Sequence, residues 1–336
     1  MSIRFLYCTD LHNRSERDQP KNRTDNYYKS ILEKQEEIGE IIKREKVDCL
    51  LFGGDLFHHF DPPLGLVNDV AAIWGKYAVD AIIGVIGSHD YNGYQVTTLR
   101  RTGVGNFLTH NMMQLVGNSS SEFVLFPSFI NYKGVLITGT PHSSGLIDDP
   151  KNFSTGEFED KTSCVIQMVH GDLFNDHCVW PHQEISDVHP FITADLVLSG
   201  HIHSGWKTPD IRVNFNSATG KTHYINPGSI GRTSIGKIRP IQVVLIEIDH
   251  SLLLSYRFIR LSHVIEDPFV EKSEVPEGSP VTDFTQLMKL ISTLELKQTD
   301  FKKHIPHVIE EICGDSPYLK QVTDRVFEAL EQQKEH

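Results

Sequence analysis

Five short polar motifs, each directly after an apolar run typical of a buried strand, constrain this chain more than any other feature. The motifs are Asp10-Leu11-His12, Gly54-Asp55, Gly87-Ser88-His89-Asp90, His170-Gly171-Asp172 and Gly200-His201-Ile202-His203. Ligands of an α/β sheet bind at the carboxyl ends of its strands, so we expect the five loops to converge on one site.

The side chains of these motifs suit metal ions. They offer carboxylates, chiefly Asp10 and Asp55, together with up to five imidazoles and no thiolate. This mixture of nitrogen and oxygen donors favours Mn²⁺, Fe²⁺ or Zn²⁺ over Ca²⁺ or Mg²⁺. Two ions about 3.5–4 Å apart, sharing one carboxylate and a hydroxide, would hydrolyse a phosphoryl group by in-line attack. Each motif alone also fits an ordinary surface turn, but the five together favour the metal site.

The first part of the chain alternates strand and helix patterns. Residues 3–8, 47–53 and 81–87 predict strands, whereas the helical spacing of apolar residues in 27–46 and 64–77 predicts helices. This order indicates an α/β fold that begins with a parallel, right-handed arrangement.

From residue 112 onward the pattern changes to short strands. We expect a helix at 97–110, a long loop at 145–161, and strands at 112–116, 122–127, 135–138, 164–170, 195–199, 223–226, 241–249 and 252–261. The last two strands resemble a hairpin around Asp249-His250-Ser251, and we expect them to complete the second sheet of the domain.

A boundary is predicted after Ser262. Residues 1–262 then form the catalytic domain, 263–282 an acidic, proline-containing linker, and 283–336 a small C-terminal helical extension that binds a partner or caps the sheet. Residues 263–336 contain 15 acidic and 8 basic side chains, a net charge of −7. This extension is therefore better suited to contact protein than DNA.

Composition excludes several classes of protein. A net charge of −12 argues against a globally basic nucleic-acid coat protein, although not against a local basic groove. No apolar run approaches the roughly 18–20 residues of a membrane span, and residues 1–10 lack a signal-peptide pattern. The five scattered cysteines fit neither a disulfide framework nor a cysteine-ligated zinc site, and they favour the reducing cytoplasm.

Taken in order, the motifs resemble those of the calcineurin-like metallophosphoesterases, whose pattern is D-x-H, G-D, G-N-H-[DE], H-G and G-H-x-H. The resemblance spans residues 10–203 and implies a four-layer αββα sandwich. It also implies two divalent ions: a first held by Asp10, His12, Asp55 and His203, and a second held by Asp55, Ser88, His170 and His201. His89 would be a catalytic histidine that binds no metal, stabilises the pentacoordinate phosphorus and protonates the departing oxygen.

Ser88 stands where the family has asparagine. A serine hydroxyl is shorter, and it is a weaker donor to a cation than an amide carbonyl. Three readings follow: water fills the gap, the second metal binds loosely, or activity is reduced. We favour a working site, because His89 and every other ligand are retained.

Further residues resemble the SbcD-type DNA repair nucleases, the branch that includes the meiotic recombination nuclease. Residues 53–58 read Gly-Gly-Asp-Leu-Phe-His, and the resemblance implies that His58 orients the DNA phosphate and the catalytic histidine. The segment 226–232, Asn-Pro-Gly-Ser-Ile-Gly-Arg, contains the branch's P-G-S, which makes Ser229 and Arg232 candidates to bind phosphate. Arg14, in a basic loop after the first motif, is a third candidate.

The resemblance also implies partners. They are DNA, a second copy of the chain packed through the helices at 64–77 and 97–110, and an SbcC-type coiled-coil ATPase gripped by the C-terminal helices. Only residues 241–261 lie between the P-G-S turn and the linker, which leaves little room for the separate capping domain of larger members. We therefore expect a compact version from a bacterium or a phage-infected cell.

Three functions are therefore weighed. The leading hypothesis is a Mn²⁺-dependent nuclease of DNA repair and recombination, acting through a metal-bridging hydroxide. The second is a small-molecule phosphodiesterase or phosphatase with the same site, since N-P-G-S-x-x-R also occurs in such enzymes. The third is a catalytically weakened scaffold, in which Ser88 in place of asparagine indicates that activity has been lost.

Overall fold

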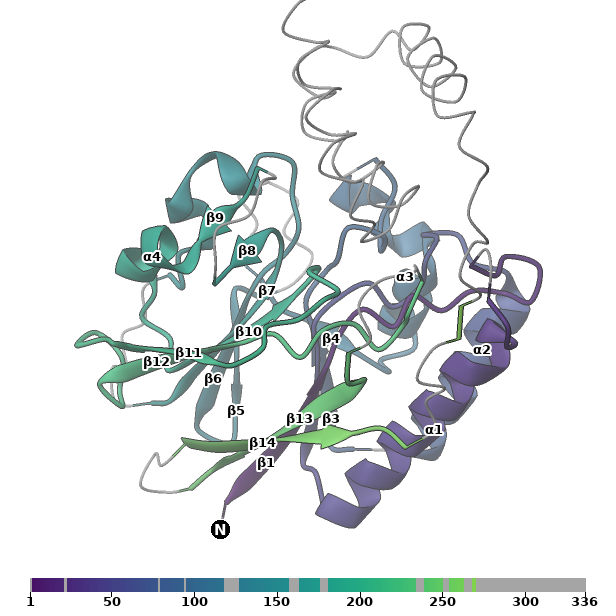
Figure 1. The fold of residues 1–336 in the computed structure, drawn as a ribbon, viewed down its shortest axis with the longest axis horizontal. Coiled ribbons are helices and arrows are strands. Elements are labelled where there is room, and N and C mark those ends of the chain that lie inside the picture. Colours follow the sequence, from purple (N-terminus) through teal and green to yellow (C-terminus); the bar gives the residue numbers. More distant parts are fainter. Residues whose placement is uncertain are drawn as a thin grey trace, which may run out of the picture.

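The structure is a computed structural model (Figure 1). It describes residues 2–20, 23–77, 79–93, 95–117, 127–156, 163–175, 181–233, 239–249, 254–262 and 268–269. The predicted linker at 263–282 lies outside these residues except for Pro268 and Phe269, and so do the predicted helices at 283–336 and most of the predicted strand at 122–127.

The first sheet has the strand order β14-β13-β1-β2-β3-β4. Its parallel part is β1 (Ile3–Cys8), β2 (Cys49–Phe52), β3 (Ala81–Gly84) and β4 (Gln114–Leu115). The connecting helices are α1 (Tyr27–Glu45), α2 (Leu64–Lys76) and α3 (Gly103–Thr109). The predicted parallel α/β start is therefore confirmed.

The prediction that the last two strands complete the second sheet is wrong. β13 (Gln242–Ile248) pairs antiparallel with β1, and β14 (Leu254–Arg260) pairs with β13, so both extend the first sheet. The chain runs outward from β1 through β2 and β3 to β4, which leaves the other edge of β1 without a neighbour. β13 supplies the hydrogen bonds that this edge needs.

The second sheet has the order β11-β12-β10-β7-β6-β5. Its strands are β5 (Phe129–Tyr132), β6 (Val135–Thr140), β7 (Val165–His170), β10 (Leu196–Gly200), β11 (Asp210–Val213) and β12 (Lys221–Ile225). β5 and β11, which were not predicted, are the two edge strands, and their half-exposed residues give a weaker hydrophobic pattern than the central strands do.

Short elements complete the described chain. They are the strand pair β8 (Leu173–Phe174) and β9 (Gln183–Glu184), the helix α4 (Ile185–Val188), and the 3₁₀ helices η1 (Val96–Arg101), η2 (Leu146–Asp148), η3 (Pro150–Phe153) and η4 (His189–Phe191). The helix predicted at 97–110 is divided into η1 and α3 at Thr102, whose hydroxyl accepts a hydrogen bond from Gly105 N. The loop predicted at 145–161 contains η2 and η3.

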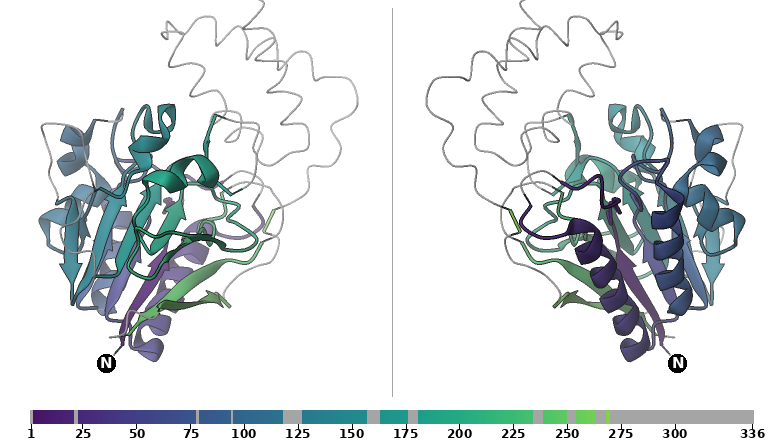
Figure 2. Two further views of the ribbon diagram at one scale, coloured as in Figure 1. Left: turned by 90° about the vertical axis from the view of Figure 1, so that its left-hand side faces the viewer. Right: turned by 90° about the vertical axis from the view of Figure 1, so that its right-hand side faces the viewer.

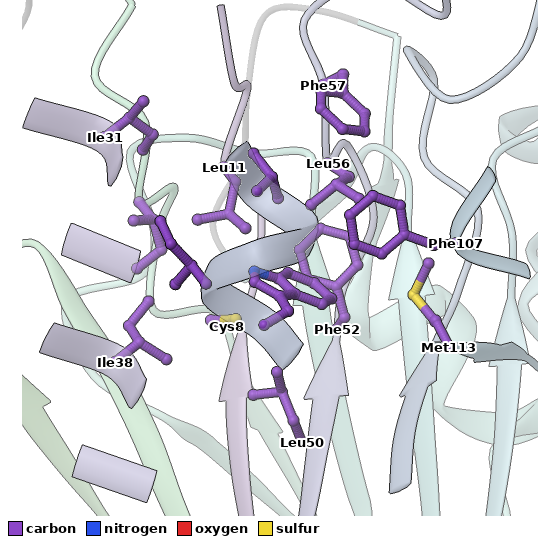
Figure 3. Close-up of a cluster of buried hydrophobic side chains, with 14 of the residues drawn as sticks. Cys8, Leu11, Ile31, Ile38, Leu50, Phe52, Leu56, Phe57, Phe107 and Met113 are labelled. Carbon is purple, nitrogen blue, oxygen red and sulfur yellow. The ribbon is translucent and has the colours of Figure 1, made fainter. Parts of the chain in front are cut away.

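Three hydrophobic clusters separate four layers. Figure 2 shows α1 and α2 along the outer face of the first sheet, and Figure 3 shows the cluster beneath them, where Ile31 and Ile38 pack towards Cys8 and Leu50. A second cluster fills the space between the sheets, for example Leu51 with Ile166. A third packs the short helices η3 and α4 against the outer face of the second sheet. The predicted four-layer αββα sandwich is therefore confirmed.

A part of the chain that follows β14 contacts the loop before α1. The carbonyl of Pro268 accepts hydrogen bonds from both the amide and the hydroxyl of Thr24, so this later part of the chain returns to the domain.

Among the described residues, no helix is long and apolar enough to span a membrane.

Candidate metal centre

The five motifs lie together at the carboxyl ends of β1, β2, β3, β7 and β10. Contacts between the loops show this directly: Asp10 N donates to the Gly54 carbonyl at 3.0 Å. Across the two sheets, His201 N donates to the Asp10 carboxylate at 3.1–3.2 Å, and the Nδ1 atom of His170 lies 2.6 Å from the Gly53 carbonyl. Because the strands within each sheet run parallel here, their loops meet at one edge.

The backbone at this edge is strained where the candidate ligands sit. Asp10, His12, Asp55 and His201 all have positive φ angles, of 53°, 45°, 57° and 72°. Each such conformation costs a non-glycine residue roughly 1–2 kcal/mol. Strain of this kind persists only where surrounding contacts enforce it, and it clusters at functional sites.

The first donor group consists of Asp10, His12 and His203. The Nε2 atoms of the two histidines lie 2.9 Å apart, and each is 3.6–3.8 Å from the nearer Asp10 oxygen. Burial and the neighbouring His203 hold the pKa of His12 well below its usual value. His12 is therefore neutral at pH 7, which is the form that coordinates a metal ion.

The second donor group consists of Asp55, His170 and His201. Since Nδ1 of His170 points at the Gly53 carbonyl, Nε2 is the nitrogen available to a ligand. That Nε2 atom is buried and has no hydrogen-bond partner of good geometry, although Asp55 Oδ2 lies 3.3 Å away. Burial opposes charge on His170, but the Asp55 carboxylate outweighs it and raises the pKa to about 10.

Asp55 joins the two groups. Its Oδ2 atom is 3.3 Å from His170 Nε2 and 3.6 Å from His12 Nε2, so one carboxylate oxygen faces a histidine of each group. Despite burial, His170 and His89 keep the pKa of Asp55 well below its usual value. Two clusters of imidazole and carboxylate donors that share one carboxylate fit a pair of divalent ions.

His89 and His58 lie beside these groups. His89 N donates to Asp55 Oδ1 at 2.8 Å, and its Nδ1 atom is 2.6 Å from the His58 carbonyl. The His58 ring stacks on His89 with centroids 4.9 Å apart, and its Nδ1 atom is 3.4 Å from His12 Nδ1. His58 therefore contacts both the predicted catalytic histidine and a predicted metal ligand.

Ser88 lies at the second group, where its hydroxyl donates to Asp55 Oδ2 at 3.2 Å. Sequence reasoning gave no role to its neighbour Asp90, whose buried carboxylate accepts hydrogen bonds from the amides of Gly87, Asp55 and Leu56 at 2.8–3.0 Å. Asp90 thus fixes two of the loops to each other. Its place at the end of the third motif is the signal that could have identified it.

His142, two residues after β6, is a second residue that sequence reasoning missed. Its ring centroid is 5.3 Å from that of His201 and 6.3 Å from that of His170. Like the other histidines of the site, it follows a buried strand, and this is the signal that was available in the sequence.

The three candidate phosphate-binding residues are largely covered. The Arg14 side chain is 12% exposed and lies 3.5 Å from Asp18, and Ser229 is 1% exposed. Arg232 is 8% exposed, with its guanidinium 5.5 Å from the ring centroid of Phe269. Of the three, Ser229 is tied to the site through its backbone, because its amide donates to the His203 carbonyl at 3.1 Å. Their role in binding phosphate stays a prediction.

A comparison with protein-family models finds one match, described as calcineurin-like phosphoesterase, over residues 3–205. No curated protein matches the chain.

Several solved structures resemble the chain at low identity. The TT1561 protein of Thermus thermophilus is 14% identical, with a TM-score of 0.40, over 76% of this chain and 99% of its own. A putative 5'-nucleotidase from Staphylococcus aureus, solved with alpha-ketoglutarate, is 15% identical (TM-score 0.46; 87% of this chain and 58% of its own). The calcineurin-like phosphoesterase YfkN from Bacillus subtilis is 14% identical (TM-score 0.45; 77% and 88%).

Proposed function

The chain belongs to the calcineurin-like phosphoesterase family, and from this premise we propose that it is a Mn²⁺-dependent nuclease that hydrolyses phosphodiester bonds in DNA. Enzymes of this family typically bind two divalent ions, and the two donor groups fit such a pair. The family makes the protein a metal-dependent phosphoesterase; the choice of Mn²⁺ and of DNA is our proposal.

The observation on which the proposal rests is the contact of Asp55 with both donor groups and with His89. A pair of ions held there would polarise the phosphoryl oxygens and lower the pKa of an attacking water. His89, held by Asp55 and by the His58 carbonyl, is placed to donate a proton from Nε2 to the leaving oxygen. The stacked His58 ring restricts how His89 can turn.

DNA as substrate is supported by the resemblance of the segment 53–58 to SbcD-type nucleases and by the stacking of its His58 ring on His89. The short helix η1, which follows the His89 loop along the chain, adds positive charge through the exposed side chains of Arg100 and Arg101. These features agree with recognition of a phosphate backbone rather than of a base.

A second candidate is hydrolysis of a small phosphodiester. It is favoured by the low exposure of Arg14, Ser229 and Arg232, because buried residues offer a long polymer little surface. The third possibility, a weakened scaffold, rests on Ser88 alone.

The proposed partners follow from the nuclease hypothesis. We propose a homodimer that uses α2, where Leu64 is 67% exposed, and an SbcC-type ATPase that binds residues 283–336. We also propose the cytoplasm of a bacterial or phage-infected cell as its location.

The test is digestion of labelled linear duplex and single-stranded DNA by the full chain in Mn²⁺. His89→Ala removes the proposed acid, and His223→Ala, on β12, is the matched control. We expect metal-dependent digestion that is lost in His89→Ala and kept in His223→Ala. Turnover of bis-p-nitrophenyl phosphate without digestion of DNA would instead select the small-phosphodiester function.

A further inference from the structure

We propose that His142 is a ligand of the second metal ion, completing the group formed by Asp55, His170 and His201. The inference rests on the proposed two-ion function and assigns a residue that none of the five sequence motifs contains.

The strand order of the second sheet places His142 next to this group. β10, β7 and β6 are neighbouring parallel strands, and their register aligns Gly200 with His170 and Thr140 with Val169. His201 directly follows β10, His170 is the last residue of β7, and His142 lies two residues after β6. Three adjacent strands therefore present one histidine each at the same edge of the second sheet.

The backbone of His142 is fixed to the loop that contains Ser88 and His89. Its amide donates to the Ile86 carbonyl at 3.1 Å, and its carbonyl accepts a hydrogen bond from the Tyr91 hydroxyl. Ile86 and Tyr91 stand on either side of residues 87–90. His142 is thus held from the first sheet as well as from the second, as a ligand position requires.

Ring geometry agrees with a shared ion. A metal lies about 2.1 Å from a coordinating imidazole nitrogen and hence about 3.2 Å from the ring centroid, so two ligand rings on one ion are at most about 6.4 Å apart. The centroid separations are 5.1 Å for His170 and His201, 5.3 Å for His142 and His201, and 6.3 Å for His142 and His170. All three pairs satisfy the limit. The donor atoms that already lie within 4.8 Å of one another are those of Asp55, His170 and His201, so the His142 ring has to turn towards them to share the ion.

The chemistry of the group leaves room for this ligand. Ser88 donates a 3.2 Å hydrogen bond to Asp55 of the second group, and a neutral hydroxyl is a weak donor to Mn²⁺ or Zn²⁺. An imidazole suits these ions, and His142 is half-buried.

The experiment measures Mn²⁺ binding to the full chain by calorimetry and by electron paramagnetic resonance, which detects a coupled pair of ions. The variants are His142→Ala, His142→Phe, which keeps a ring but no nitrogen, and His223→Ala as control. We expect two ions in the wild type and in the control. In both His142 variants the second ion should bind at least about tenfold more weakly. Ser88→Asn, which extends a longer donor towards the same ion, should restore much of that affinity in His142→Ala.

The outcomes separate the two proposals. Unchanged affinity for the second ion in both His142 variants, with two ions in the wild type, overturns the ligand assignment and leaves the proposed function standing. Fewer than two ions in the wild type overturns both. Unchanged melting temperatures of the metal-free variants are the check that they remain folded.

Discussion

The two donor groups of the metal centre arise from the same kind of strand end, yet they hold their histidines differently. In the first group, buried His12 lies among the rings of His58, His89 and His203, and its pKa is depressed, so it is already neutral. In the second, His170 lies between the Gly53 carbonyl and the Asp55 carboxylate, and its pKa is raised to about 10. His12 of the first group can therefore bind a cation without losing a proton, whereas His170 of the second group must release its proton when a cation binds.

The largest expected effect comes from replacing Asp55, whose carboxylate contacts both donor groups. Asp55→Asn replaces the carboxylate that contacts both groups and His89. Both ions should bind weakly, and hydrolysis should fall at least about 10⁴-fold, because the charge stabilisation supplied by the ions amounts to several kcal/mol. Steady-state kinetics with Mn²⁺ measure this loss. If only the second ion were lost, Asp55 would belong to one group alone.

His89→Ala should separate chemistry from metal binding. We expect kcat to fall by about 10²–10³-fold while both ions stay bound, which lies within the roughly 10²–10⁴-fold that a general acid typically contributes. Parallel measurement of kcat and of Mn²⁺ stoichiometry distinguishes this from a structural effect. Loss of an ion in the variant would mean that His89 acts on the site through Asp55 rather than on the substrate.

The different pKa values of His12 and His170 predict different dependence on pH. His170 is protonated without metal up to about pH 10, so binding at the second group should release its proton, and affinity should rise about tenfold per pH unit from pH 6.5 to 8.5. His12, whose pKa lies well below its usual value, should release none. Calorimetry in two buffers of different ionisation enthalpy counts the released protons for each ion. Equal pH dependence of the two binding steps would remove the distinction between the groups.

The smallest expected effect concerns the support of the first group. His58 Nδ1 lies 3.4 Å from His12 Nδ1, so His58→Gln should loosen His12 and weaken the first ion by about tenfold. His59→Gln is the matched control, because the His59 side chain is largely exposed and pairs with Asp18. A titration in which both variants bind the first ion as the wild type does would limit His58 to contact with His89.

Sequence patterns predicted the central strands better than the edges. β1, β2, β7 and β10 are buried throughout, or nearly so, and their apolar runs are unmistakable, whereas β5 and β11 alternate between half-buried and exposed residues. The pairing of β13 with β1 was not predictable, because an apolar run shows that a strand is buried but not which edge it joins.

The site could be predicted where motif and strand end coincide. Asp10 and His201 follow buried strands in recognised motifs, and the structure brings their loops into contact. His142 also follows a buried strand, but a single histidine in Thr-Pro-His-Ser matches no motif, so only the register of β6 with β7 places it near the others. Arg232 lies over the ring of Phe269, a residue distant in sequence, and a local sequence pattern cannot reveal such a contact.

Hydrolysis of bis-p-nitrophenyl phosphate by the full chain, with Mn²⁺ and then with a chelator, tests the central claim most directly, because this substrate needs no DNA-binding surface. We predict turnover that requires the metal and falls about 10²–10³-fold in His89→Ala. No turnover by the wild-type chain at saturating Mn²⁺ would contradict the claim that the two donor groups form a working phosphodiesterase site.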